Sequence, residues 1–317
     1  NTAKNTYSLW DGASDTLWGV ARPPIEGGPH NFSRAGVAYV ICNSNATIGT
    51  YTGGKADYLG RYTAIFGAPT CTDSATAPSN GNSYGRSLYT GSVITNGNVD
   101  RIFANFAKSI AAYERLIVSK NSAFDQWANG NENAMTVAQK RGLKIFIGKG
   151  NCVRCHSGSN FSDGSFHNLG VPQIGGYSGT NDQGRYDGIT TLVSGAGATF
   201  NTASIYNDGS TNRVSSIANS TSNIGKFKTP TLRSVNKTAP YFHNGTFTSL
   251  WDVVNFYNFA GNGGNFPGTK DTVLTTRRMT NEEMEDLVEF LIALEGESLS
   301  TSLTTSNISS SVTTPVW

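Results

Sequence analysis

The chain has 317 residues, of which 15% are charged, and its formal net charge at pH 7 is only +2. This length is sufficient for one large or two ordinary domains. The nearly balanced charge excludes the strongly basic surface of a nucleic-acid-binding protein, and no apolar run is long enough to cross a bilayer. With 36 glycines and no recognisable signal peptide, we expect a loop-rich, mature form of an exported protein.

The first half of the chain contains three expected helices. Residues 1–98 read as irregular apart from a short helix at about 56–66. Apolar side chains at helical spacing predict a longer helix over 99–119. A third helix is expected at 136–147, where a Gly-Lys-Gly run marks its end.

The second half combines helices with weakly patterned segments. Residues 173–227 are rich in Gly, Ser, Asn and Thr and read as a long surface loop or insertion. A helix is expected at 248–258, and Thr280 begins a last helix with a capping-box pattern that runs to about Leu294. Residues 298–317 form a Ser/Thr-rich tail without a core-forming pattern. The sequence therefore predicts a mainly α fold with long loops.

The run Cys152-Val153-Arg154-Cys155-His156 is the strongest chemical signal in the chain. C-x-x-C-H is the attachment signature of c-type haem: two thiols bond the haem vinyl groups and the histidine supplies an axial nitrogen. The alternatives are a chance CxxC, a zinc half-site and a thioredoxin-like pair. Zinc needs a second Cys/His cluster, which the sequence lacks, and a thioredoxin motif needs a βαβ setting and no following histidine. The motif therefore predicts one covalent haem c.

The two remaining cysteines, Cys42 and Cys71, form a natural pair. A disulfide between them is the simple interpretation, and two buried free thiols are the alternative. A disulfide and covalent haem c both belong to compartments outside the cytoplasm. We therefore expect a periplasmic or extracellular location.

A second axial ligand for the haem has to come from elsewhere in the chain. Met, His and Tyr are the usual residue types. The methionine and histidine candidates are Met135, Met279, Met284, His30, His167 and His243. The residues alone leave this choice open, because each of these side chains is also common on a surface or in a core.

Three blocks of sequence resemble a known protein family, and this resemblance narrows the choice of the second haem ligand. The first is SLWDG at residues 8–12, followed by Pro-Ile-Glu; the second runs from Gly142 through CVRCH to FHNLGVP; the third joins FKTPTLR at residues 227–233 to TAPYFHNG at 238–245. In this order they resemble the bacterial di-haem cytochrome c peroxidase and MauG-like family. The resemblance implies two c-type haem domains face to face, with this haem motif in the second.

The resemblance divides the chain and assigns roles to its residues. Residues 1–128 correspond to part of the N-terminal domain, and residues 129–297 to the C-terminal haem domain with the insertion at about 173–227. The distal ligand position falls on Tyr257, and the alternative is a core aromatic on an amphipathic helix. Trp10 matches a tryptophan between the two haems and would relay electrons.

Further roles follow from the same comparison. Thr238 and Pro240 match positions whose carbonyls hold calcium between the domains, although the side-chain ligand would lie upstream of residue 1. His167 and His243 match positions near the haem. Arginine binds carboxylates with a planar fork, so propionate partners are expected at residues Arg185 and Arg233.

The chain also departs from the family pattern. The first CxxCH of the family would precede Trp10 and is absent, so we expect a fragment, a second haem-bearing polypeptide, or a natural single-haem derivative. The position of the glutamate that helps to break the peroxide bond in the family is occupied by His30. Glu26 could stand in for that glutamate, or His30 could handle protons or ligate a neighbouring haem.

Two functions from different classes remain at this point. The first is a peroxidase-like or MauG-like oxidoreductase that passes electrons through a His156/Tyr257-ligated haem, with hydrogen peroxide reduced at a second haem. Its partners would be an electron-donor protein or another haem-bearing polypeptide. The alternative is a non-catalytic electron carrier in an extracellular or multi-haem assembly. Either could form a homo-oligomer.

Overall fold

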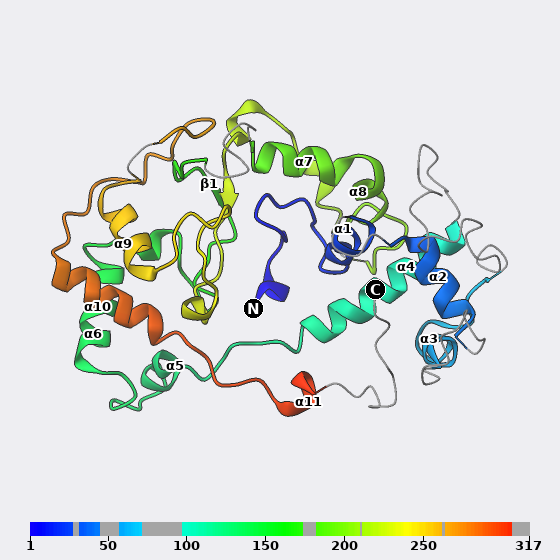
Figure 1. Cartoon of the computed structure of the whole chain (residues 1–317), viewed down its shortest axis with the longest axis horizontal. Helices are drawn as coiled ribbons and strands as arrows, with labels where there is room; N and C mark the ends of the chain where they lie inside the picture. Colours follow the sequence, from blue (N-terminus) through cyan, green and yellow to red (C-terminus); the bar gives the residue numbers. More distant parts are fainter. Residues whose placement is uncertain are drawn as a thin grey trace.

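The computed structural model describes residues 1–27, 32–44, 57–71, 97–173, 182–209, 211–261 and 264–305 (Figure 1). Its α-helices are α1 (Arg22–Glu26), α2 (Arg34–Cys42), α3 (Tyr58–Phe66), α4 (Gly97–Glu114), α5 (Ala123–Ala128), α6 (Val137–Ile147), α7 (Arg185–Val193), α8 (Gly195–Thr199), α9 (Leu250–Asn258), α10 (Asn281–Ile292) and α11 (Thr301–Thr304). Its 3-10 helices are Thr2–Lys4, Trp18–Ala21, Cys152–Arg154, Val214–Ser216, Thr221–Asn223 and Val235–Lys237.

The predicted mainly α fold is confirmed. Strands β1 (Phe166–His167) and β2 (Phe227–Lys228) form a two-stranded antiparallel sheet, in which Phe166 pairs with Lys228. None of the helices in the described ranges has the length and apolar character that a lipid bilayer requires.

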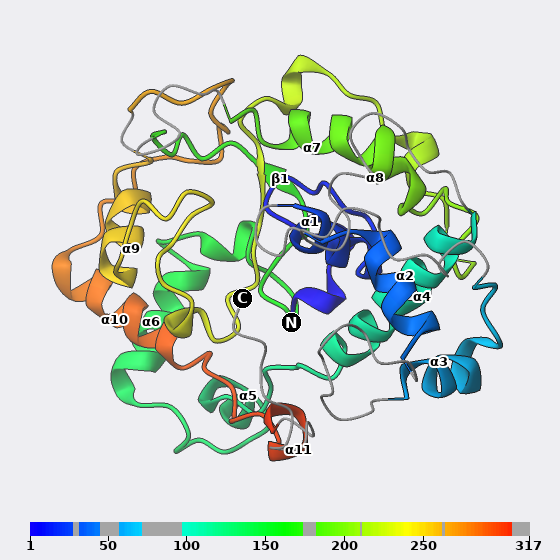
Figure 2. The same cartoon turned by 45° about the vertical axis from the view of Figure 1, so that its right-hand side comes forward.

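The described part of the chain has two apolar clusters at opposite ends of the molecule (Figures 1 and 2). In the first, α2 and α4 pack together, and Phe103 of α4 lies edge-on against Phe200 at 5.4 Å between ring centroids. In the second, α6 and α10 pack together with α9, around Phe146 and Phe290. The second cluster supports the segment that carries the CxxCH motif.

Helices α3, α4, α6, α9 and α10 confirm the five helices that periodicity predicts. Their starts follow from side-chain caps. Thr136 and Thr280 each accept a bond from the backbone N–H three residues on and receive the reciprocal bond, which is a capping box. Ser249 caps α9 with a bond from the N–H of Asp252.

The prediction of a surface loop over residues 173–227 is wrong for much of this segment. Helices α7 and α8 occupy residues 185–199, and Ile189 and Leu192 are buried. Phe200 and Tyr206 belong to the first apolar cluster. The segment therefore contributes to the core. Its few apolar residues are spaced too irregularly for a helical period to show in the sequence.

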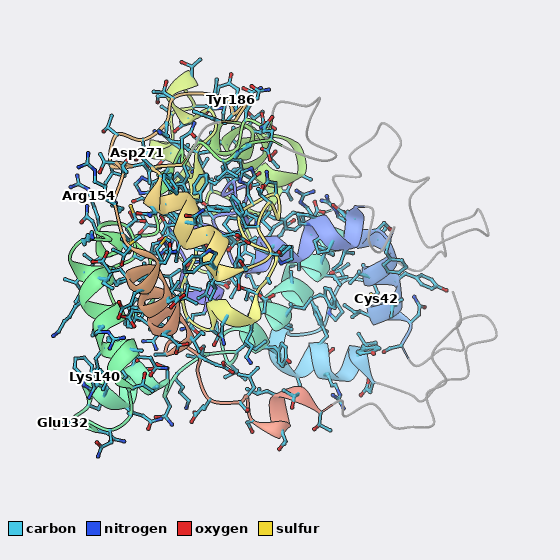
Figure 3. All side chains as sticks on the ribbon, turned by 60° about the vertical axis from the view of Figure 1, so that its left-hand side comes forward. Cys42, Glu132, Lys140, Arg154, Tyr186 and Asp271 are labelled. Atoms are coloured by element: carbon cyan, nitrogen blue, oxygen red, sulfur yellow. A yellow bond between two sulfur atoms is a disulfide. The ribbon has the colours of Figure 1, made fainter. Side chains whose placement is uncertain are left out.

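The predicted disulfide is confirmed between Cys42 and Cys71, whose Cα atoms lie 5.7 Å apart. It joins the last residue of α2 to the segment that follows α3. Figure 3 shows Cys42 far from Arg154 of the CxxCH motif. The cross-link therefore belongs to the first apolar cluster and takes no part in the haem motif.

The contact between α6 and α10 depends on Gly142. A Cβ atom at this position would collide with the backbone carbonyl of Asp286 and would also lie 2.8 Å from the Cβ of Phe290. Beside this close approach, Arg141 donates two hydrogen bonds, of 2.6 and 2.7 Å, to the carboxylate of Asp286. The glycine thus sets the distance between the two helices that support the haem motif.

We expect Gly142→Ala to lower the free energy of unfolding by about 2 kcal/mol, because the added methyl group forces the two backbones apart. Urea unfolding followed by circular dichroism measures the change. Lys144→Ala, at an exposed position of the same helix, is the control and should stay within about 0.5 kcal/mol. Helix propensity alone favours alanine by about 1 kcal/mol, so a stabilised Gly142→Ala protein would contradict the packing argument.

Candidate haem site

A tight turn after α6 presents the CxxCH side chains. Asn151 has a left-handed backbone, and the following 3-10 turn closes with bonds from the N–H groups of Cys155 and His156 to the carbonyl of Cys152. These bonds bring the two thiols and the imidazole to the same cavity. The local chain therefore has the compact geometry that attachment to one planar group needs.

The cavity has a volume of about 350 Å³ and a predominantly apolar wall. Segments far apart in the sequence form it, including the CxxCH turn, β2 and α9. The sequence-predicted residues that line it are Trp10, Cys152, Cys155, His156, His167, Arg233, Thr238, Pro240, His243 and Tyr257. Apolar walls with a few convergent polar groups suit a large planar cofactor.

One ring nitrogen of His156 is hydrogen-bonded within the fold, and the other is available for another interaction. Its Nδ1 lies 2.9 Å from the carbonyl oxygen of Phe161, which can only accept, so Nδ1 carries the proton. Burial holds the pKa of His156 below its usual value, which favours the neutral ring. Metal-ligating histidines commonly donate their other ring N–H in this way, so Nε2 is suited to bind iron.

Tyr257 comes from α9 and lines the same cavity as the CxxCH residues. Its hydroxyl makes no hydrogen bond with any other residue in the described part of the chain. Burial, followed by the nearby Cys152 and Cys155, raises the pKa of Tyr257. A phenolate at this position therefore needs a cationic partner in the cavity, and ferric iron meets that requirement.

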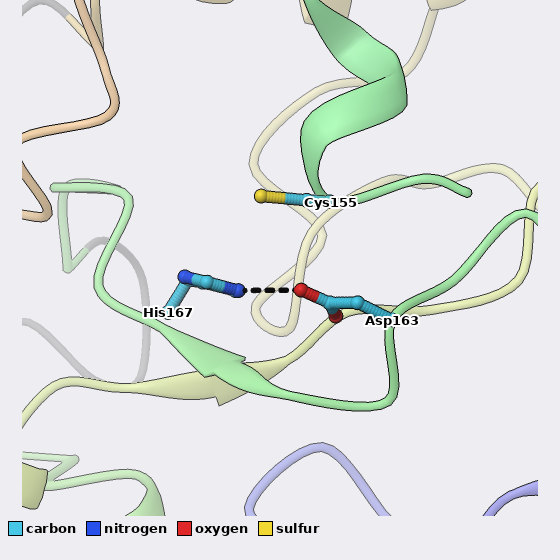
Figure 4. A group of neighbouring side chains, drawn as sticks. All are labelled: Cys155, Asp163 and His167. Carbon is cyan, nitrogen blue, oxygen red and sulfur yellow. Dashed lines mark hydrogen bonds and ion pairs between the residues drawn. The ribbon is translucent and has the colours of Figure 1, made fainter.

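His167 lines the cavity and lies between two carboxylates, one of which, Asp163, is drawn with it in Figure 4. Its Nε2 is 2.9 Å from Asp163, and its Nδ1 is 2.7 Å from Asp271. The hydrogen bond to the Cys155 sulfur, with those to Asp271 and Asp163, raises the pKa of His167 to about 10 against the effect of burial. Because both ring nitrogens face carboxylates, the ring is held as a cation and is poorly suited to bind iron.

His243 is stacked on Phe227, with ring centroids 3.5 Å apart and an angle of 9° between the rings. Burial lowers the pKa of His243 to about 4. The imidazole is therefore neutral at pH 7, in contrast to His167.

The low pKa of His243 predicts that the protein loses stability in acid. An unfolded histidine takes up a proton near pH 6.5, whereas folded His243 resists until about pH 4, so the free energy of unfolding falls as the pH falls through this range. We expect a contribution of about 1 to 2 kcal/mol between pH 7 and pH 5. Urea unfolding of wild type and His243→Phe, which keeps the ring stack, measures it. An identical pH dependence in both proteins would exclude His243 as the source.

The two arginines expected to bind propionates have different surroundings. Arg233 lines the cavity, but its guanidinium already donates a 2.5 Å bond to Asp125 and another to the carbonyl of Ser159. Arg185 does not line the cavity. Its guanidinium lies against the rings of Tyr7 and Phe166 and donates a hydrogen bond to the Gly12 carbonyl. The structure therefore corrects the expectation for Arg185, whose donors are used within the fold.

The expected acid–base residue Glu26 is not among the described residues that line the cavity. Glu26 lies beside the first apolar cluster, where its carboxylate accepts bonds of 2.5 and 3.0 Å from Arg34. Arg34 in turn donates to Asp100 at 2.7 Å. Glu26 is thus held in an ion-paired network away from the CxxCH turn. His30 falls outside the described residues.

Sequence reasoning gave no role to three charged residues of the cavity wall, Arg154, Lys228 and Arg277. Lys228 lines the cavity from β2, and its backbone N–H donates a 2.8 Å bond to the carbonyl of Trp10. It stands inside FKTPTLR, but a lysine in a strand of two residues gives no signal that it faces a cofactor cavity.

Comparisons with known proteins find cytochrome c peroxidases and MauG proteins among the relatives of this chain. A family model described as di-haem cytochrome c peroxidase matches residues 1–133. Cytochrome-c peroxidase IdrP1 of Pseudomonas sp. (strain SCT) is 35% identical over 195 residues, which cover 59% of this chain and 48% of that protein. Methylamine utilization protein MauG of Methylorubrum extorquens is 32% identical over 189 residues, covering 60% and 43%. The chain spans about half the length of the curated relatives it matches.

A solved structure shows the same fold. The diheme peroxidase BthA from Burkholderia thailandensis matches with a TM-score of 0.58 at 19% identity, over 92% of this chain and 66% of that one. The mainly helical fold and the CxxCH cavity define the class as a c-type cytochrome. Within that class, the chain is similar to the di-haem cytochrome c peroxidases and MauG proteins.

Proposed function

We propose that this chain is the electron-transferring part of a peroxide-dependent haem oxidoreductase, with one haem c in the cavity described above. The observation that carries the proposal is the meeting of Cys152, Cys155, His156 and Tyr257 on one apolar cavity. The first two would form the thioether bonds to the haem, and the last two would bind its iron. The family relationship supports the reaction class.

The chain's own residues suit this task. Bound haem c supplies a reversible one-electron iron couple. The Phe161 carbonyl orients the imidazole of His156, and the Tyr257 oxygen would stabilise the oxidised form of the bound iron. Trp10 lines the cavity and is 41% exposed, so its ring offers a path between the haem and a partner at the surface.

The partners and location are part of the proposal. The peroxide-reacting haem, a protein electron donor and any homo-oligomer would complete the functional unit. The disulfide supports export to a periplasmic or extracellular compartment. Thr238 and Pro240 lie at the cavity wall, and their carbonyls are the proposed calcium ligands.

A haem stain after denaturing electrophoresis tests the covalent cofactor, with haem quantified per chain. We expect one haem per chain of this length and no stain after Cys152→Ser combined with Cys155→Ser. The matched control is Cys42→Ser with Cys71→Ser, which removes the other two cysteines and should keep the stain. An unstained wild-type chain, or a stained Cys152/Cys155 variant, would overturn the proposal.

A further inference from the structure

Lys228 is an unusual residue in the cavity wall. Its side chain is buried, with the residue 7% exposed, and β2 holds its backbone by the bond to Trp10. Neither an acidic partner nor a hydrogen-bond acceptor for its ammonium group occurs among the described residues. Burial therefore lowers the pKa of Lys228 with no opposing charge.

The other cations of the wall differ from Lys228. Arg233 is paired with Asp125, Arg277 donates to Thr275 and Val273, and Arg154 is exposed. A buried ammonium group is costly unless an anion pairs with it. A lysine that is buried beside a cofactor cavity without an anionic partner is suited to bind an anionic part of the cofactor.

We propose that Lys228 binds a propionate carboxylate of the haem in this cavity. This inference rests on the proposed haem site and adds a cofactor-binding residue to it. The apolar wall suits the macrocycle, whereas the propionates are its anionic groups and need a cationic partner or water. Lys228 replaces Arg185 in this role, because the donors of Arg185 are used by the fold.

The pairing has a consequence for the iron. A positive charge near the haem opposes the more positive ferric state, so its removal should lower the reduction potential. A unit charge about 10 Å away in a partly buried site changes such an equilibrium on the order of tenfold. For a one-electron couple, tenfold corresponds to about 59 mV.

The test compares the midpoint potentials of the holoprotein and three variants by spectroelectrochemical titration. We expect Lys228→Met to shift the ferric–ferrous equilibrium about tenfold toward ferric, and Lys228→Arg to retain most of the wild-type value. Lys226→Met is the matched control, since Lys226 is two residues away and does not line the cavity. Its potential should stay near wild type.

Several results would overturn the inference. Equal potentials for Lys228→Met and Lys226→Met would exclude the pairing. A saturable response of the wild-type potential to acetate, lost in Lys228→Met, would mean that the lysine is open to a free carboxylate. If Lys228→Met fails to load haem, the propionate bending band in the wild-type resonance Raman spectrum decides: it should shift in D2O, and an unshifted band would contradict the pairing. The haem stain separates these outcomes from failure of the haem site itself.

Discussion

Replacement of Tyr257 by Phe is expected to change the ferric haem from six-coordinate and low-spin toward five-coordinate or water-ligated. The substitution removes one oxygen and keeps the ring, so packing in α9 against Phe242 and Phe256 is preserved. A phenolate favours ferric iron, so its loss should also raise the reduction potential. Electronic absorption and electron paramagnetic resonance spectra of the purified holoprotein measure the change.

The cavity offers a matched control for this experiment. Tyr241 also lines it, and Tyr241→Phe removes an equivalent hydroxyl. Its ferric spectrum should match that of wild type. An unchanged spectrum in Tyr257→Phe would rule out Tyr257 as a ligand, and a changed spectrum in Tyr241→Phe alone would assign the ligand to Tyr241.

Removal of the disulfide is expected to cause the largest loss of stability. The cross-link spans a sequence separation of 29 residues. Closing a loop of this length restricts the unfolded chain, and the corresponding stabilisation is about 3 to 4 kcal/mol. Cys42→Ser combined with Cys71→Ser should lose this amount, as measured by urea unfolding followed by circular dichroism.

The matched comparison uses the single variants. Cys42→Ser and Cys71→Ser should each lose about as much as the pair, because either one opens the loop. A double variant as stable as wild type would contradict a stabilising cross-link. The haem spectrum should stay unchanged in all three, since the disulfide lies away from the CxxCH turn.

The sequence predicted the helices that have a strong local signal. Thr136 and Thr280 begin helices with capping boxes, and their apolar side chains recur at helical spacing. Local propensity and tertiary packing agree in these segments. Helix α2 was missed inside a segment read as irregular, although Ser33 caps it with a bond from the N–H of Gly36.

Helices α7 and α8 show why composition misled the prediction. Their segment is rich in small and polar residues, yet small residues permit close packing. At Gly188, a Cβ atom would collide with the backbone carbonyl of Asp11. Gly188 therefore permits a contact with the N-terminal segment, which no local pattern reveals.

The residues of the candidate site also divide into those that have a local sequence signal and those that do not. Cys152, Cys155 and His156 form a local motif and could be assigned from five consecutive residues. Tyr257 required the family resemblance, because it reaches the cavity from a helix about a hundred residues away. Arg185 uses its donors within the fold, whereas Lys228 lines the cavity, because the sequence gives a residue's charge but not its neighbours. Only the fold shows which cation already has partners.

Trp10 illustrates how the N-terminal segment is attached to the cavity. Its carbonyl accepts a bond from the backbone of Lys228, whereas its ring is partly exposed at the cavity. The anchoring thus uses main-chain atoms that every amino acid possesses. The side chain at this position can therefore be exchanged without loss of the main-chain bond that holds the N-terminal segment to the cavity wall.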